Sequence, residues 1–335
     1  MFDHVAIVGA TGAVGQEFLR VIEKRNFPYK KLTLLASARS AGKTIEFKGE
    51  QLTVQELKED SFKDIDLALF SAGGSITKKF APIAVQSDCV VVDNSSAFRM
   101  DPETPLVIPE VNPEDVKTHK GIIANPNCST IVMLMACYPI HRISAMKKIV
   151  VSTYQAASGA GAAAMEELKV QAGEYLAGKR GGDLTMEQFP FPIAFNAFSH
   201  NSPMDAANGY NQEETKMIKE THKILHDDSI LVAPTCIRIG TFRAHAESVH
   251  LELERDVGLD DVRKALADFP GVSLIDDREA NRFPMPLESS DQDDVFVGRL
   301  RHSSGAGGNT LDLFCCGDQI LKGAALNAVQ IAELL

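Results

Sequence analysis

The chain has 335 residues, 44% of them hydrophobic, and a formal net charge of −11 at neutral pH. This length is typical of two domains, and the acidic balance argues against a general affinity for nucleic acid or anionic membranes. No apolar run approaches the roughly 20 residues that span a bilayer, so we predict neither a nucleic-acid partner nor a membrane partner.

The N-terminal sequence MFDHVAIVGA has no basic n-region and leads directly into a strand-like segment, so we predict no signal peptide. The six cysteines are then expected to remain thiols, and the cytoplasm is the expected compartment. No CxxC pair occurs, and the adjacent Cys315 and Cys316 lie in an apolar run, which favours core packing. We therefore predict no metal site.

The first part of the chain alternates short apolar strands with helices. A strand is predicted over 4–9 and an amphipathic helix over 13–25. Further apolar strands are predicted over 31–37, 65–74, 89–96 and 121–127. Strands of this kind, separated by helices, imply a parallel sheet covered on both faces, which is a doubly wound α/β domain.

After about residue 127 longer alternating strands occur, such as 244–255, and the helices are set apart from them. This arrangement favours an α+β second domain. Helices are predicted over 163–178, 212–225 and 259–269, and a long loop over 189–205. The apolar C-terminal segment is predicted to be a helix that returns to the first domain. The predicted domains are 1–127 with about 317–335, and 128–316.

The sequence GATGAVG (9–15) follows the first predicted strand and opens the first helix. Glycine suits such a turn because it permits positive φ and lets the backbone approach a phosphate, to which the helix N-terminus offers N–H groups. The spacing GxxGxxG is a variant of the usual GxGxxG, and no Gly-Lys-Ser/Thr follows, so this is not a P-loop. Glycine-rich turns also occur without ligands, but the position at the start of a βαβ pattern favours a dinucleotide.

The end of the second predicted strand bears on which dinucleotide is bound. NAD-binding proteins place an acidic residue there for the ribose 2′-hydroxyl, whereas ASARSAGK (36–43) contains none. Ser37, Arg39 and Ser40 offer hydroxyl and guanidinium donors that suit a 2′-phosphate. The alternative is a solvated turn with an incidental arginine. The missing acid and the arginine together favour NADP.

Cys128 lies in NPNCSTIVMLMAC (125–137), after a predicted strand and turn and at the start of a predicted helix. A thiol at a helix N-terminus has a lowered pKa, and the thiolate is the nucleophilic form. Free cysteine is also among the most buried residue types, and Cys137, in the middle of the same helix, is predicted to be of that kind. The local sequence leaves packing and reactivity of Cys128 as alternatives.

A cysteine nucleophile needs a base, and His245 is a candidate because it lies between strand-like segments of the second domain. The pattern does not exclude His250 in the same stretch. Two arginines suit anionic ligands. Arg99 follows an apolar strand, at the edge where doubly wound sheets bind ligands. Arg238 has apolar neighbours, and a partly buried arginine usually has a carboxylate or phosphate partner, or else an internal salt bridge.

These segments together resemble the aspartate-β-semialdehyde dehydrogenase family along nearly the whole chain and in the family's order. The matching segments are GATGAVG, LASARSAGK, DNSSAFRMD, VIPEVNP, ANPNCSTI, YQAASGAG, NQEETKM and RIGTFRAHAESV. The resemblance implies a Rossmann-type NADP domain and an α+β catalytic and dimerisation domain, as in glyceraldehyde-phosphate dehydrogenase. It also implies a homo-oligomer, most often a dimer in the family.

The activity that the resemblance implies is reduction of L-aspartyl 4-phosphate by NADPH, which gives aspartate semialdehyde and phosphate on the path to lysine, threonine, methionine and diaminopimelate. Cys128 is similar to the family's acyl-thioester nucleophile, His245 to its acid/base catalyst, and Gln155 to the glutamine that orients the acyl intermediate. Arg238 resembles the clamp for the substrate α-carboxylate, and Glu213 the partner of its amino group.

The resemblance implies two further sets of contacts. Arg99 and Lys216 match the phosphate site. The residues that resemble NADP contacts are Thr11, Gly12, Ala13, Val14, Arg39, Ser40, Ser158, Gly159 and Gln319.

Three alternatives are open to the same sequence. N-acetyl-γ-glutamyl-phosphate reductase shares the fold and thiol chemistry, but typically has NPGC followed by Tyr or Phe, where this chain has Asn127 and Ser129. A non-catalytic NADP-binding regulator would only pack Cys128. A cysteine hydrolase would leave the dinucleotide turn unexplained.

Overall fold

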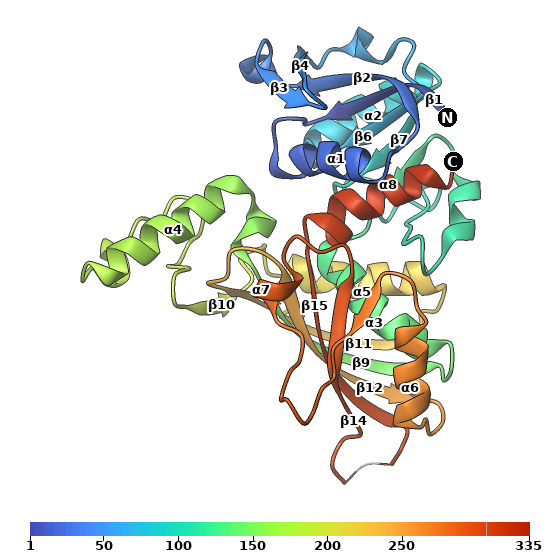
Figure 1. Cartoon of the computed structure of the whole chain (residues 1–335), viewed down its shortest axis with the longest axis vertical. Helices are drawn as coiled ribbons and strands as arrows, with labels where there is room; N and C mark the ends of the chain where they lie inside the picture. The colour runs from blue at the N-terminus through green and yellow to red at the C-terminus, as the bar shows by residue number, and fades with distance from the viewer. Residues whose placement is uncertain (306) are drawn as a thin grey trace. The chain divides into compact units, whose positions relative to one another are not determined.

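The computed structural model describes residues 1–305 and 307–335 and contains two compact units (Figure 1). The first unit is Met1–Asn127 with Gly323–Leu335, and the second is Cys128–Lys322. The C-terminal segment that belongs with the first unit is therefore shorter than the predicted 317–335. None of the described helices is long and apolar enough to cross a membrane.

The first unit is built on a parallel sheet, whose strand order is β5-β2-β1-β6-β7-β8. The strands are β1 (Phe2–Val8), β2 (Tyr29–Ala36), β5 (Gln55–Glu56), β6 (Leu67–Phe70), β7 (Val90–Asp93) and β8 (Ile122–Ala124), and a separate hairpin joins β3 (Thr44–Phe47) to β4 (Glu50–Thr53). The helices are α1 (Ala13–Lys24), α2 (Gly74–Gln86) and α8 (Leu326–Glu333), and short 3-10 turns lie at Ala38–Ser40, Glu59–Phe62 and Pro113–Thr118. The predicted parallel α/β sheet is confirmed.

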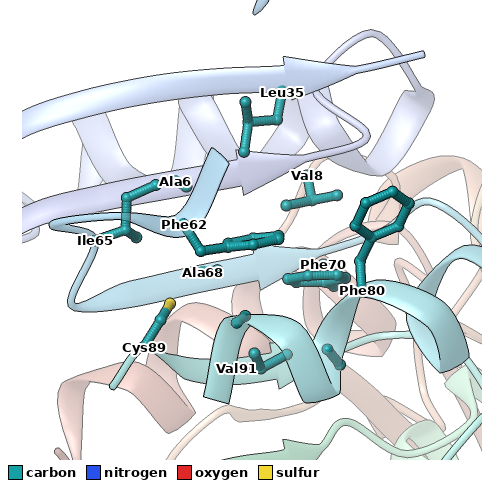
Figure 2. Close-up of a cluster of buried hydrophobic side chains, with 12 residues drawn as sticks. Ala6, Val8, Leu35, Phe62, Ile65, Ala68, Phe70, Phe80, Cys89 and Val91 are labelled. Carbon is teal, nitrogen blue, oxygen red and sulfur yellow. The ribbon is translucent and has the colours of Figure 1, made fainter. Parts of the chain in front are cut away.

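Aromatic packing fills one side of this sheet, as Figure 2 shows. Phe62 stacks on Phe70 of β6 with ring centroids 5.8 Å apart, and Phe80 of α2 packs beside Phe62. All three side chains are at most 7% exposed. Burying such large apolar groups holds α2 on this face of the sheet.

The second unit is built on a mixed sheet, which among the described residues has the order β10-β11-β9-β12-β15-β14-β13. Its strands are β9 (Met146–Gln155), β10 (Ala197–Ser199), β11 (Leu231–Ile239), β12 (His245–Leu253), β13 (Val272–Leu274), β14 (Val295–Arg301) and β15 (Thr310–Gly317). Its helices are α3 (Cys128–His141), α4 (Ala162–Leu176), α5 (Gln212–Leu225), α6 (Leu259–Ala267) and α7 (Pro286–Ser289), with 3-10 turns at Ala157–Ala160 and Gly181–Asp183. The α+β prediction is confirmed.

The two faces of this mixed sheet differ. Helices α3, α5 and α6 lie along one face (Figure 1), and alternate residues of the central strands are buried there. The opposite face keeps partly exposed side chains, including Val150, Ser152, Tyr154, Ile237 and Phe314. One sheet therefore presents a buried face that can hold a site and an open face that can meet a partner.

Two predicted elements differ from the structure in kind and not only in length. The segment 189–205 is not only a loop, because β10 within it pairs antiparallel with β11 and places Ala197 opposite Ile239. The C-terminal helix does not begin at residue 317. Gly317 ends β15, and the Asp318 carboxylate accepts the N–H groups of Ile320 and Leu321, after which a π-helical turn over Leu321–Ala325 leads into α8.

Candidate active site

The glycine turn after β1 has the features of a dinucleotide-binding turn. Gly9 has φ +90°, and a Cβ on it would lie 2.3 Å from the Ser71 carbonyl oxygen. A Cβ on Gly15 would lie 2.3 Å from the Gly9 carbonyl oxygen, so α1 packs tightly on the turn. Gly12 precedes α1 without a side-chain cap, which leaves the first N–H groups of the helix for an external acceptor. The turn therefore fits a pyrophosphate.

The end of β2 carries the residues expected at an adenosine ribose. Arg39 is exposed on a 3-10 turn, and Ser40 is buried with its hydroxyl 3.4 Å from that of Thr11. The hydroxyl contact links this turn to the glycine turn. Both belong to the first unit, and an exposed guanidinium beside them fits a 2′-phosphate.

Arg99, also in the first unit, is buried and ordered by main-chain carbonyls. Its Nε donates to the carbonyl of Asn125 at 2.9 Å and its Nη2 to that of Asn94 at 2.8 Å. Asn125 stands three residues before Cys128 in the chain. The predicted phosphate-binding arginine is therefore attached to the segment that leads into the cysteine helix.

The cysteines separate as the sequence predicted. Cys128 is the first residue of α3 and is half-buried, whereas the other five thiols are buried. Burial raises the pKa of the Cys137 thiol in the middle of α3. At the first residue of α3 a thiolate receives the partial positive charge of the helix N-terminus. Position and accessibility together favour Cys128 as the reactive thiol.

Gln155, Arg238 and His245 lie on neighbouring strands of the helix-covered face. Arg238 pairs with Gln155 in the register of β11 and β9, and the Ala156 N–H donates to His245 Nδ1 at 3.0 Å. All three side chains are at most 3% exposed. Burial lowers the pKa of Arg238, while Glu213 and the Cys128 thiol favour its charged form. The guanidinium thus lies within electrostatic reach of the thiol.

His245 is held as a neutral imidazole. Burial, with help from Arg238, lowers its pKa to about 3, and Glu213 opposes this. Because Nδ1 accepts the Ala156 N–H, a neutral ring carries its proton on Nε2. His250, the alternative, is on the other face of β12, where its Nδ1 contacts Asp312 at 2.7 Å. The structure therefore favours His245 as the site histidine.

The Gln155 amide is oriented by Thr153. The Thr153 hydroxyl donates to Oε1 at 3.0 Å, which directs Nε2 toward the Glu213 carboxylate at 3.2 Å. The same Nε2 lies 3.5 Å from His245 Nε2. Thr153 is fully buried, so this orientation is enforced by the sheet.

Helix α5 supplies Glu213 and Lys216 from its first turns. A capping box fixes the start of the helix, with Asn211 and Glu214 exchanging main-chain and side-chain hydrogen bonds at 2.9 Å. Lys216 Nζ lies 3.0 Å from a Glu213 oxygen. Glu213 and Lys216 therefore lie together at one helix end, where they form an ion pair with each other.

The remaining predicted cofactor contacts of the second unit lie beside the same face. The Gln319 amide donates to the buried Ser158 hydroxyl. A Cβ on Gly159 would lie 3.3 Å from His245 Nε2 and 3.4 Å from an Arg238 nitrogen. A side chain at position 159 would therefore press against both His245 and Arg238.

Comparison with known proteins now decides the family. Residues 4–119 match the family model "Semialdehyde dehydrogenase, NAD binding domain", and residues 137–322 match "Semialdehyde dehydrogenase, dimerisation domain". An aspartate-semialdehyde dehydrogenase of Synechocystis is 54% identical over 99% of this chain and 97% of its own length. The chain belongs to the aspartate-semialdehyde dehydrogenase family. The family predicted from the sequence is confirmed.

Other members of the aspartate-semialdehyde dehydrogenase family agree. The Aquifex aeolicus enzyme is 52% identical over 99% of this chain and 97% of its own length. A crystal structure of aspartate semialdehyde dehydrogenase II from Vibrio cholerae, complexed with ASA, has a TM-score of 0.95 and 43% identity, and the match covers 100% of this chain and 98% of that one. The first unit is accordingly an NAD(P)-binding domain, and the second a dimerisation domain.

Three side chains near the site were not singled out in the sequence. Thr153 and Glu247 lie on buried faces of β9 and β12, and His200 follows β10. For Glu247 a signal exists, because AHAESVHLEL places an acid at an inward position of an alternating strand. For Thr153 and His200 the sequence contains no such signal, because their roles depend on which strands are neighbours.

Glu247 is a buried acid two residues after His245 on β12, so both side chains lie on the same face of the strand. It pairs in register with Thr153 and Cys315, and neither carboxylate oxygen has a hydrogen-bond partner among residues 1–305 and 307–335. Burial, and secondarily Glu213, raises the pKa of this carboxyl well above its usual value. The folded protein therefore holds Glu247 protonated where an unfolded chain would release the proton.

Replacing Glu247 with glutamine should stabilise the protein at neutral and alkaline pH. A carboxyl with a raised folded-state pKa costs stability as pH rises above its unfolded value, by up to roughly 1.4 kcal/mol per pH unit. Urea denaturation of Glu247→Gln and wild type, at one protein concentration and at pH 5 to 8, should show a gain that grows with pH. Glu252→Gln, on the same strand but paired with Lys148, is the control. A gain independent of pH would contradict the protonated state.

Proposed function

We propose that this chain carries out the reaction of its family through an acyl thioester at Cys128. The reaction is NADPH-dependent conversion of L-aspartyl 4-phosphate to L-aspartate 4-semialdehyde and phosphate. The observation that carries the proposal is the accessible thiol at the first residue of α3, within electrostatic reach of Arg238 on the face that also buries His245 and Gln155. A packed structural cysteine needs none of these neighbours.

Cys128 acts as the nucleophile. The positive end of α3 and the Arg238 guanidinium stabilise its thiolate, which attacks the acyl carbon and displaces phosphate. Lys216, on the first turns of α5, and Arg99, the buried arginine of the first unit, are the proposed phosphate contacts. They stabilise the negative charge that develops on the leaving oxygen.

Arg238 binds the substrate α-carboxylate. Its Nη1 donates to the Ala156 carbonyl at 2.8 Å and its Nη2 contacts His200 at 2.7 Å. Its Nε is buried without a partner among the described residues. Nε and the second hydrogen of Nη2 thus offer a fork that matches a carboxylate. Glu213, which already meets a cation in Lys216, suits the substrate ammonium group.

His245 and Gln155 are the proposed hydrogen-bonding partners of the substrate's acyl group. The Nε2 proton of neutral His245 is a donor to that oxygen, and the amide of Gln155 orients the acyl group. To act as the proposed acid/base catalyst the ring must take up a proton on Nδ1 in place of the hydrogen bond from the Ala156 N–H, and the negative charge of the thiolate and the oxyanion favours this. His245 then exchanges a proton with the thiohemiacetal oxygen as the aldehyde is released.

The glycine turn and the end of β2 would hold NADPH, which would supply a hydride for reduction of the thioester. The proposed contacts are Thr11, Gly12, Ala13, Val14, Arg39, Ser40, Ser158, Gly159 and Gln319. NADP is preferred over NAD because the segment 36–43 offers Arg39 and Ser40 and no acid.

Replacing Arg39 with alanine should weaken NADPH binding about tenfold or more and NADH binding less than about threefold, because only the former has a 2′-phosphate to pair. Fluorescence titration of both cofactors measures this. Lys31→Ala, an exposed lysine earlier on β2, is the control for the loss of a surface charge. Equal losses for both cofactors would overturn the role of Arg39.

We further propose that the protein is a homodimer joined through the open face of the mixed sheet. Tyr154 and Phe314 on that face are 6.4 Å apart between ring centroids and only partly buried, and Leu231 on the neighbouring β11 is 66% exposed. Apolar groups of this kind favour a protein partner.

All six cysteines are thiols, which suits the proposed cytoplasmic location.

The decisive assay runs the reaction backward. Purified protein should reduce NADP with aspartate semialdehyde only when phosphate is present, since phosphate must attack the thioester to form the acyl phosphate. N-acetylglutamate semialdehyde, assayed in parallel, should be a poor substrate. Turnover of the acetylated aldehyde alone would instead assign N-acetyl-γ-glutamyl-phosphate reductase activity, and no turnover of either would leave a non-catalytic role.

A further inference from the structure

His200 lies beside the proposed carboxylate-binding arginine although it is distant in the sequence. It follows the short edge strand β10, and its main-chain N–H donates to the Cys236 carbonyl of β11 at 2.8 Å. This pairing brings its ring to Arg238, whose Nη2 lies 2.7 Å from His200 Nε2. The edge strand thus carries a side chain to the site.

The chemistry of this contact defines the state of the ring. A guanidinium has donors and no acceptor, so His200 Nε2 must accept and must be unprotonated. In the neutral ring Nδ1 then carries the proton and donates to the Ser202 hydroxyl at 3.1 Å. The Ser202 main-chain N–H also points at Nδ1, at 3.2 Å, and it could donate there only in the other tautomer, which would turn a ring N–H against the Arg238 donor 2.7 Å away. The short contact with Arg238 therefore selects the tautomer.

The hydrogen bonds continue from His200 to the start of α5. The Ser202 hydroxyl accepts the Glu213 N–H at 3.1 Å and donates to Asn211, the residue that caps α5, at 3.4 Å. A continuous path therefore joins Arg238 to the helix end that carries the proposed ammonium partner. His200 and Ser202 thus connect Arg238 to the main chain of Glu213 by hydrogen bonds.

Arg238 needs such a partner because its other contacts do not fix its plane. The Ala156 carbonyl accepts one hydrogen bond, at 2.8 Å, and the Phe189 ring lies 5.6 Å from the guanidinium carbon. One acceptor and one aromatic face allow rotation about the first hydrogen bond. His200, as a second acceptor at Nη2, prevents that rotation. The N–H of the unpartnered Nε then points in one fixed direction.

The surrounding charges keep the ring neutral. Burial is the main cause that lowers the pKa of His200 to about 4; Arg238 and Lys216 act in the same direction, and Glu213 opposes them. His245 faces it as a second neutral ring. At neutral pH His200 is therefore an acceptor, and protonation would place a second cation against the guanidinium.

We propose that His200 is a positioning residue, which holds Arg238 in the orientation that binds the substrate carboxylate and ties that arginine to the start of α5. The proposal rests on the proposed function, since it assumes that Arg238 binds this carboxylate. In this proposal His200 affects substrate binding by orienting Arg238 and does not contact the reacting atoms.

The test compares His200→Leu with His200→Gln, whose side-chain oxygen can reach the position of Nε2. We expect His200→Leu to raise the KM for aspartate semialdehyde about tenfold while kcat changes less than about threefold, because ground-state binding is lost. His200→Gln should stay within about threefold of wild type in both constants. The asparagine side chain is too short to reach Arg238, so His200→Asn should resemble His200→Leu. If His200→Leu does not fold, the comparison of His200→Gln with His200→Asn tests the proposal. His222→Leu, which loses a contact with the Ile230 carbonyl, is the control.

A second measurement separates positioning from loop stability. 3-Aminopropanal is aspartate semialdehyde without its carboxylate, so His200→Leu should leave kcat/KM for this aldehyde unchanged while lowering it for the full substrate. Equal losses for both aldehydes, or an unchanged KM in His200→Leu and His200→Asn, would overturn the proposal. Failure of the proposed function is distinguishable, because wild type would then show no phosphate-dependent turnover of aspartate semialdehyde.

Discussion

Replacing Cys128 with alanine should lower kcat by about 10⁴-fold or more, because no other group can form the thioester and removal of a nucleophile alone has effects of this size. NADPH affinity should not change, since the proposed cofactor contacts do not include the thiol. Steady-state assay with aspartate semialdehyde and phosphate, together with fluorescence titration of NADPH, measures both quantities on the same preparation.

Cys137→Ala is the matched control, because it removes a thiol from the same helix. Cys137 is fully buried, and its thiol has a raised pKa. Its loss should cost about 1 kcal/mol of stability through a small cavity and leave kcat unchanged. Rapid alkylation should likewise modify Cys128 and spare Cys137. Residual activity of Cys128→Ala near that of wild type would refute the thioester.

The first unit was predictable because its signals are local. The helix predicted over 13–25 is Ala13–Lys24, and the strand predicted over 4–9 is Phe2–Val8. Apolar runs and a glycine turn specify such elements regardless of what lies beside them. Other ends moved further, since strand ends depend on hydrogen-bonded neighbours: the strand predicted over 65–74 is Leu67–Phe70, and α2 begins at Gly74.

The second unit was less predictable because its site is assembled across strands. The three residues of β10 carry no strand signal, and they become a strand only by pairing with β11. His200 becomes important through the same pairing. The position of Cys128 at the start of a helix could be predicted because a helix start is a local feature. The contact between His200 and Arg238 depends on register, which no local pattern contains.

Burial keeps both histidines of the site neutral beside a charged arginine. It lowers the pKa of His245 to about 3 and that of His200 to about 4, so both rings are neutral at neutral pH. Arg238 remains charged because a guanidinium cannot be deprotonated under these conditions. An acidic protein can therefore bind an anionic substrate, since the relevant charge is local and desolvated.

Replacing Arg238 with methionine should lower kcat/KM for aspartate semialdehyde by about 10³-fold, because removing one partner of a buried charged contact costs about 2–5 kcal/mol. Methionine keeps much of the volume against Phe189 but provides no donor for the carboxylate. Most of the loss should be in KM, and NADPH binding should be unaffected. Steady-state kinetics over a wide range of substrate concentration separates the two constants.

The control is Arg263→Met, in which an arginine of the same unit loses its pairing with Asp276 at 2.9 Å. Any general cost of removing a paired guanidinium appears in both variants as a lower midpoint of urea denaturation. Only Arg238→Met should change KM, and its loss should be much smaller with 3-aminopropanal, which has no carboxylate to bind. An Arg238→Met enzyme with a wild-type KM would show that the carboxylate is bound elsewhere, because no other change in that variant can restore a desolvated positive charge.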